Sequence, residues 1–145
     1  KVNFLVQCGA SPSGIANKLL RRDSLAKYRI IPKVLDSLEL FKEGEVASIL
    51  ARKEWFEETG AHNRDCEDVL EMIMSMAIVK VAVFVRVVSN RVRVSLRSKG
   101  NIDVSKIAGH FNGGGHFNAA GCSVDTSDVE KAKELVLKEI FELYK

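Results

Sequence analysis

A run of three glycines followed by a histidine, Gly113-Gly114-Gly115-His116, is the segment best suited to chemistry. Glycine adopts positive φ angles readily and lets a ligand approach the bare main chain, and successive amides in such a turn can bind an anion. Small residues follow at 119–121, and we expect them to form a short helix whose N-terminus offers further amides to a phosphate. His116 would stand at the start of that helix and donate a hydrogen bond to a phosphate oxygen. A flexible loop needs neither the histidine nor the small residues, so the pattern predicts an anion site.

Arginines alternate with apolar residues along 91–98, which is typical of a strand. Because side chains alternate between the faces of a strand, one face would carry Arg91, Arg93, Ser95 and Arg97. A two-residue turn at Ser89-Asn90 would pair this strand with the preceding one, over 79–88. In that register Arg86 lies opposite Arg93, Phe84 opposite Ser95 and Ala82 opposite Arg97.

The arginine-bearing face could hold a phosphate and a base, since guanidinium groups match phosphate oxygens and aromatic rings stack on bases. Arg97 is the strongest candidate, because Ser95 adds a hydroxyl group beside it and Ala82 leaves space opposite it. Arg91 and Arg93 lie near the turn, where we expect them simply to be exposed to solvent. A solvated strand face, with arginines present for solubility, is the alternative interpretation.

The histidines and cysteines form no metal-binding pattern. His62 and Cys66 are near each other in sequence, but no second compact pair of ligands accompanies them. The three cysteines include no CxxC spacing, which argues against a disulfide framework and favours a reducing cytoplasm. The sequence also lacks a cluster of aspartates and histidines for a divalent ion. We therefore expect no metal ligands and no catalytic residues in this chain.

The composition is that of an ordinary globular protein of 145 residues, with 46% hydrophobic and 28% charged residues. A net charge of +3 argues against a histone-like coating of nucleic acid as the function, but it is compatible with a local basic patch. The longest apolar run, at 81–85, is far too short for a membrane span. The sequence therefore predicts a cytoplasmic protein with no membrane partner.

The elements expected around these residues alternate between helix and strand. Ser11-Pro12 should start a first helix, and Pro32 should break or kink a second one over 24–38. The turn at Glu43-Gly44-Glu45 would separate residues 1–43 from a domain over 44–145. In that domain we expect strands at 46–50, 79–88, 91–98 and 122–124, and helices at 53–58, 65–76, 103–111 and from 127 onward. This order predicts an α/β fold with a mixed β-sheet flanked by helices and preceded by a helical connector.

The run from Gly113 to Gly121 resembles the GGGHxxAAG signature of the C-terminal domain of DHH-family phosphoesterases. The segments Ser95-Leu96-Arg97-Ser98 and Glu58-Thr59-Gly60-Ala61 are similar to that family too. The resemblance covers nearly the whole chain and points to the NrnA-like branch of oligoribonucleases and pAp phosphatases. It implies that residues 1–43 are the end of a catalytic domain with its connector, and that 44–145 are the DHH-associated substrate-binding domain.

The resemblance implies that the full enzyme depends on Mn²⁺, held in an N-terminal catalytic domain by aspartates and histidines. The Asp-His-His triplet of that domain is absent from this sequence, so we expect the chain to bind substrate, to hold no cofactor itself and not to hydrolyse. By the same resemblance Gly113, Gly114, Gly115 and His116 would contact the substrate, Arg97 would hold a phosphate, and Ser95 and Asn118 would assist. The substrate would be short RNA, pAp, or a linear or cyclic dinucleotide. A homodimer is compatible with the resemblance.

Two other functions fit the same residues. Alanyl-tRNA synthetases carry a related C-terminal domain that serves tRNA, so the chain could be a nucleic-acid-binding module without chemistry. A purely structural or dimerising domain is the third interpretation. The helices expected at 11–40 favour the phosphoesterase. A preference for short 5′-phosphorylated RNA over long structured RNA would separate these functions.

Overall fold

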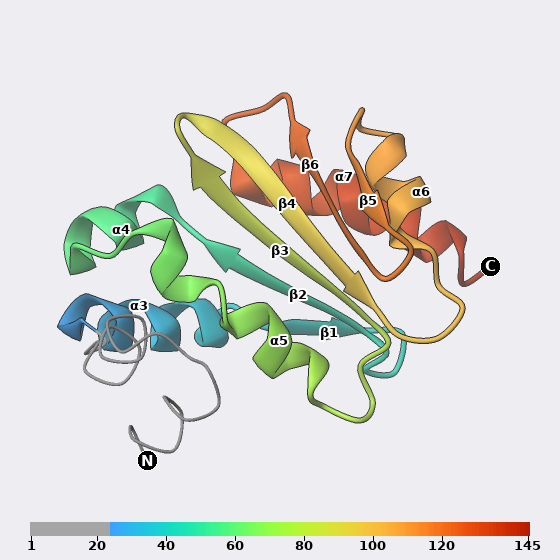
Figure 1. Ribbon diagram of the computed structural model, residues 1–145, viewed down its shortest axis with the longest axis horizontal. Coiled ribbons are helices and arrows are strands. Elements are labelled where there is room, and N and C mark those ends of the chain that lie inside the picture. The colour runs from blue at the N-terminus through green and yellow to red at the C-terminus, as the bar shows by residue number, and fades with distance from the viewer. Residues whose placement is uncertain (1–23) are drawn as a thin grey trace, which may run out of the picture.

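A six-stranded mixed sheet forms the centre of residues 24–145, the part of the chain that the computed structural model describes (Figure 1). The strands are β1 (Glu39–Phe41), β2 (Val46–Ala51), β3 (Val81–Val88), β4 (Arg91–Ser98), β5 (Gly114–His116) and β6 (Ala119–Val124). The helices are α3 (Leu25–Asp36), α4 (Lys53–Thr59), α5 (Val69–Met74), α6 (Val104–Gly109) and α7 (Val129–Glu142), with a 3-10 turn, η1, over Asn63–Cys66. The predicted α/β class with a mixed sheet is confirmed, whereas the helix expected from Ser11-Pro12 lies outside the described residues.

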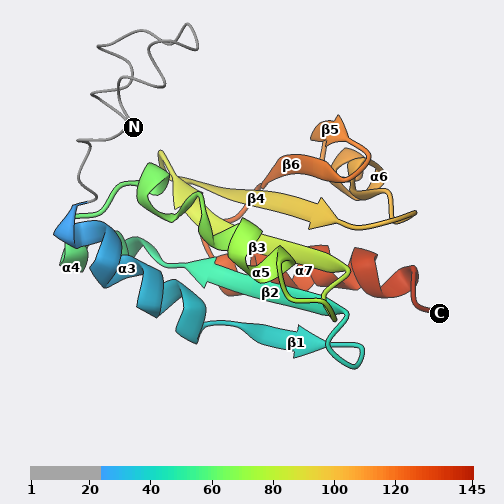
Figure 2. The ribbon, with the colours of Figure 1, turned by 60° about the horizontal axis from the view of Figure 1, so that its bottom comes forward.

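The strands follow the order β1-β2-β3-β4-β6-β5, so β1 and β5 form the opposite edges of the sheet (Figure 2). Only β2 and β3 are parallel, and every other neighbouring pair is antiparallel. The parallel pair is joined by a long crossover through α4, η1 and α5, as parallel pairing requires.

The sheet separates two apolar cores, with α6 and α7 on one side and α3, α4 and α5 on the other (Figures 1 and 2). Strand β3 contributes to both. Val81, Val83 and Val85 pack with α6 and α7, while Ala82 and Phe84 pack with α3 and α5. This alternation is the period-two pattern of a strand buried on both faces.

The hairpin of β3 and β4 has the predicted register. Arg86 pairs with Arg93, Phe84 with Ser95 and Ala82 with Arg97. Ser89 and Asn90 have φ angles of 49° and 63°, the positive values that a tight two-residue hairpin turn needs.

Phe84 does not have the role that the sequence analysis gave it. Its side chain is 1% exposed, because Cys66 of η1 and Val69 and Leu70 of α5 pack in the same core. The Arg86 guanidinium lies 5.1 Å from the centre of its ring. The prediction that this ring stacks on a base is therefore wrong.

The helical connector also differs from expectation. Helix α3 continues through Pro32 and ends at Asp36, although proline removes a main-chain hydrogen bond. Ile30 and Val34, on either side of the proline, are fully buried, and their packing keeps the helix continuous. The sequence analysis did not predict β1, which pairs with β2. The predicted turn at 43–45 is present and joins these two strands, so α3 and β1 share the sheet and core of the residues that follow.

The remaining helices are close to their predicted positions. Helix α4 ends at Thr59, and Gly60, with a φ of 75°, forms its left-handed cap. Helix α6 buries Val104, Ile107 and Ala108. The single helix expected over 65–76 is instead divided into η1 and α5.

Candidate functional site

The glycine-rich segment is a β-hairpin, formed by β5 and β6. Gly114 pairs with Gly121, Gly115 with Ala120 and His116 with Ala119. The predicted helix at 119–121 is wrong, because these residues pair with β5 on one side and with β4 on the other. Hydrogen bonds to the strands on both sides occupy the main-chain N–H groups that would be free at a helix N-terminus. Any anion bound here meets a strand and its side chains, and no helix dipole.

Two of the three glycines are required by the close approach of β5 to β6. A Cβ atom on Gly113 would lie 2.3 Å from the Gly121 carbonyl oxygen, and one on Gly115 would lie 2.6 Å from the Cα atom of Ala120. Gly115 also has a φ of 147°, which other residues rarely adopt. A Cβ atom on Gly114 would meet nothing within 4 Å. Only Gly114 therefore leaves open space beside the main chain.

The strand pairings bring four of the predicted site residues, Ser95, Arg97, Gly114 and His116, onto one face of the sheet, whereas Gly115 pairs with Ala120, which belongs to the core on the other face. Arg97 of β4 pairs with Ala119 of β6, which pairs with His116 of β5. Directly paired residues share a face, so Arg97 and His116 flank a small alanine, with about 10 Å between their Cα atoms from the usual spacing of strands. The next row on this face is Ser95, Gly121 and Gly114. We call these two rows the open face.

Within residues 24–145, no helix packs over the open face as α3 and α5 pack over β2 and β3. The apolar core on this side of the sheet contains no residue of β4, β5 or β6. His116 and Gly114 are exposed, and Ser95, Arg97 and Gly121 are partly exposed. The floor is made of glycine and alanine, so a ligand can reach the main chain between the arginine and the histidine.

Arg97 borders this floor on the side of α5. Its Nε atom donates to Glu71 Oε1 at 3.2 Å, and its Nη1 atom donates to the Leu96 carbonyl oxygen at 2.9 Å. The Glu71 side chain is 69% exposed, and ion pairs of exposed groups stabilise a fold by only about 0.2–1 kcal/mol. A phosphate can therefore replace the Glu71 carboxylate at little cost.

Asn118 holds the turn between β5 and β6 in place. Its side-chain nitrogen, Nδ2, donates to Ser98 Oγ at 2.9 Å and to the Gly100 carbonyl oxygen at 3.2 Å. Its main-chain carbonyl oxygen accepts a hydrogen bond from the Ser98 main-chain amide at 3.0 Å. The structure thus gives Asn118 a positioning role, and its predicted contact with the substrate stays a prediction.

Arg93 is a candidate that the sequence analysis set aside. It is exposed, as is Arg91, which confirms that part of the prediction. Its terminal nitrogen, however, lies only 3.8 Å from the position of a Cβ atom on Gly121, so the guanidinium extends over the open face. The sequence could have indicated this, because residues 93, 95 and 97 alternate along one strand and therefore share a face.

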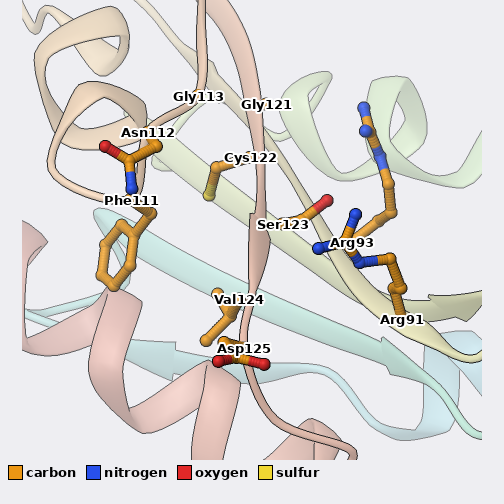
Figure 3. A pocket seen from close by; sticks show the side chains of 10 residues that line it. All are labelled: Arg91, Arg93, Phe111, Asn112, Gly113, Gly121, Cys122, Ser123, Val124 and Asp125. Carbon is orange, nitrogen blue, oxygen red and sulfur yellow. The ribbon is translucent and has the colours of Figure 1, made fainter.

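A cavity of about 470 Å³ adjoins Arg93 where β6 extends beyond β5. Figure 3 shows Arg91, Arg93 and Ser123 on one side of β6 and Phe111, Asn112 and Cys122 on the other. Among residues 24–145, no carboxylate forms an ion pair with Arg86, Arg91 or Arg93. Arg86 and Arg93 are direct cross-strand partners, so this part of the sheet carries two positive residues with no acidic partner, which favours binding of an anion.

The described residues do not fit a manganese site. Within 24–145, no group of three or more histidine, cysteine, aspartate or glutamate side chains converges. His110 instead contacts Glu139 at 2.8 Å. Burial raises the pKa of the Cys66 thiol to about 11 and also raises the pKa of the Cys122 thiol, which keeps both protonated. Since the thiolate is the form that binds metals and attacks electrophiles, neither cysteine is suited to be a metal ligand or a nucleophile.

Comparison with known protein families shows to which family the chain belongs. The DHHA1 domain matches residues 44–143. The chain belongs to the DHHA1 family. The resemblance to DHH-family phosphoesterases seen in the glycine–histidine signature is thereby confirmed.

Two curated relatives of this DHHA1 chain are oligoribonucleases. The bifunctional oligoribonuclease and PAP phosphatase NrnA of Thermus thermophilus is 31% identical over 115 residues, which are 79% of this chain and 34% of the relative. The oligoribonuclease NrnB of Bacillus subtilis is 46% identical over 52 residues, 35% of this chain and 12% of the relative. The chain thus spans about a third or less of the length of these two relatives.

Solved structures share the fold of this DHHA1 chain. An exopolyphosphatase-related protein from Bacteroides fragilis superposes with a TM-score of 0.79 at 27% identity, covering 99% of this chain and 42% of the other. The C-Ala domain of Aquifex aeolicus alanyl-tRNA synthetase superposes with a TM-score of 0.51 at 10% identity, covering 70% and 96%. At that identity the second likeness concerns the fold alone.

None of the helices in the described part has the length and hydrophobicity needed to cross a membrane.

Proposed function

We propose that this DHHA1 chain is the substrate-binding part of a phosphodiesterase or phosphatase that acts on short oligoribonucleotides, pAp, or linear or cyclic dinucleotides. The observation that carries the proposal is the row Arg97–Ala119–His116, in which a guanidinium and an imidazole flank a small residue on an open strand face. The names of the T. thermophilus and B. subtilis relatives support the substrate class.

The residues of the open face would divide the work of holding a phosphate. Arg97 supplies charge-assisted hydrogen bonds from one side, and His116 donates from the other. Ser95 offers a hydroxyl group in the neighbouring row, and the bare main chain at Gly114 and Gly121 lets the ester oxygens come close. Arg93 extends the positive surface toward the cavity at the end of β6.

The proposal assigns binding and positioning to this chain and no hydrolytic step. Among residues 24–145, no three or more histidine, cysteine, aspartate or glutamate side chains converge, so we assign any manganese-dependent reaction to residues of the enzyme outside 24–145. We expect the chain to bind substrate with Mn²⁺ present or absent, and to release no product. Hydrolysis of a 5′-phosphorylated dinucleotide by the purified chain with Mn²⁺ would contradict this division of labour.

A nucleic-acid-binding module without chemistry is the second candidate. The fold shared with the C-Ala domain favours it, and the exposed arginines of β4 suit either function. Nucleic acid held mainly by arginines binds with a strong dependence on salt and little dependence on chain ends. The length of the bound nucleic acid and the presence of a 5′-phosphate on it therefore distinguish the two candidate functions.

The deciding experiment measures binding of three ligands to the chain by titration calorimetry: pAp, a 5′-phosphorylated diribonucleotide and a folded tRNA. The substrate-binding proposal predicts that the two small ligands bind and that removing the 5′-phosphate from the dinucleotide abolishes its binding. Binding of tRNA alone would favour the second candidate. Binding of none of the three would overturn both.

A further inference from the structure

Phe117 differs from every other phenylalanine in residues 24–145. Its side chain is 45% exposed, whereas Phe84 is buried and the others are partly buried in packed clusters. The exposed part of a large aromatic side chain gains nothing from the hydrophobic effect. Phe117 also belongs to neither apolar core of the sheet.

The turn that carries Phe117 is held firmly. The Phe117 carbonyl oxygen accepts a hydrogen bond from the Val104 amide at 2.9 Å, and the next carbonyl, of Asn118, accepts one from the Ser98 amide at 3.0 Å. The Asn118 side chain adds two hydrogen bonds to the segment that follows β4. The main chain on both sides of the ring is therefore fixed, and little ordering is required when a flat ligand binds to it.

The turn that contains Phe117 adjoins the phosphate site in sequence. Phe117 directly follows His116, the last residue of the Arg97–Ala119–His116 row. In a nucleotide only the sugar separates the base from its 5′-phosphate. A phosphate held by Arg97 and His116 therefore places its own base within a short distance of the β5–β6 turn.

We propose that Phe117 is a stacking platform for the base of the nucleotide whose phosphate lies between Arg97 and His116. The proposal rests on the function proposed above and makes it more specific. Stacking needs only a flat π surface, so every base is accepted and the larger purines bind more tightly. The substrate class is then a phosphorylated nucleoside or oligonucleotide, and inorganic polyphosphate, which has no base, loses this contribution.

The ring takes the role that the sequence analysis gave to Phe84. Phe84 is on the correct strand face but lies beneath η1 and α5, while Phe117 occupies one of the two variable positions of the GGGHxxAAG pattern. A residue of this kind can set preference among substrates while the glycines and His116 keep the phosphate site unchanged.

The test compares two ligands that differ only in one base: the 5′-phosphorylated dinucleotide pApA, and the same molecule with no base on its first sugar. Their dissociation constants are measured by calorimetry for the wild-type chain and for Phe117→Ala. We expect the variant to bind pApA about tenfold more weakly, as loss of one stacked base predicts. Binding of the abasic ligand should change less than twofold.

Two variants serve as controls. Phe117→Tyr keeps a flat ring and should bind pApA as the wild type does. Leu135→Ala removes a comparably exposed apolar side chain, 40% exposed on α7, and should change neither constant. Circular dichroism of each variant checks that the fold is intact.

The outcomes separate the two proposals. Unchanged pApA binding in Phe117→Ala, or equal weakening of both ligands, overturns the stacking proposal; equal weakening would mean that the ring only supports the phosphate site. If pApA binding depends on His116 while Phe117→Ala has no effect, the proposed function stands and this inference falls. If the wild-type chain binds neither ligand, both are overturned.

Discussion

The two halves of one sheet face behave differently although their strands follow the same alternation. Over β2 and β3 this face includes Ala47, Ile49, Ala82 and Phe84, which are buried in the core with α3 and α5. Over β4, β6 and β5 the same face carries Ser95, Arg97, Gly121 and His116, none of which is buried. The difference teaches that the covered half stabilises the fold, while the open half can hold a charged ligand because no helix of residues 24–145 requires it to be apolar.

The largest effect is expected from emptying the covered half. Phe84→Ala removes a ring that is 1% exposed and should lower the free energy of unfolding by about 3–5 kcal/mol, through lost burial and a cavity. Denaturant unfolding, monitored by circular dichroism, measures this loss of stability. The matched variant Phe117→Ala, on the exposed turn, should change stability by less than about 0.5 kcal/mol. Similar losses in the two variants would remove the distinction between the halves.

The glycines of the hairpin provide the second test. Gly113→Ala places a Cβ atom 2.3 Å from the Gly121 carbonyl oxygen and should cost about 1–3 kcal/mol of stability as β5 moves away from β6. Gly114→Ala, one residue on, meets nothing within 4 Å and should be tolerated. Urea unfolding of the pair decides whether close strand approach explains the glycine run; equal stability of the two variants would refute it.

The open half is tested by its charged groups. Arg97→Ala and His116→Ala should each weaken binding of a 5′-phosphorylated dinucleotide by about 1–3 kcal/mol, the usual value for charged hydrogen bonds to a phosphate. Unfolding free energies should stay near the wild-type value, since both side chains are at least partly exposed. Lys131→Ala, on an exposed position of α7, is the control. Wild-type affinity in both site variants would rule out this face as the binding site.

The smallest effect is expected at Glu71, which borders the open half. Glu71→Gln removes the carboxylate that accepts from Arg97 and should tighten phosphate binding by less than about 1 kcal/mol, because the exposed ion pair itself is weak. Glu134→Gln, on α7, alters the net charge equally and serves as the control. Binding titrations at low and high salt measure both. Weaker binding in Glu71→Gln would show that the pair orients Arg97 and does not compete with the phosphate.

The hairpin of β3 and β4 could be predicted because its determinants are local. Ser89-Asn90 permits the positive φ angles of the turn, and the alternation of 91–98 then sets every cross-strand pair. The β5–β6 hairpin could not be recognised in the same way. Its residues are glycine and alanine, which have no side-chain alternation and suit a helix or a tight strand pair equally.

The sequence alone determined the family, the α/β class and the β3–β4 register, since each depends on neighbours in the chain or on a short motif, and it supplied the side chains proposed here to bind an anion. Tertiary structure decided that Ala119 lies between Arg97 and His116, that Phe84 is covered while Phe117 is exposed, and that Arg93 extends over Gly121. These facts depend on which strands lie side by side and where α3 and α5 end. Packing between distant segments is settled by the total burial of the fold, which no local pattern records.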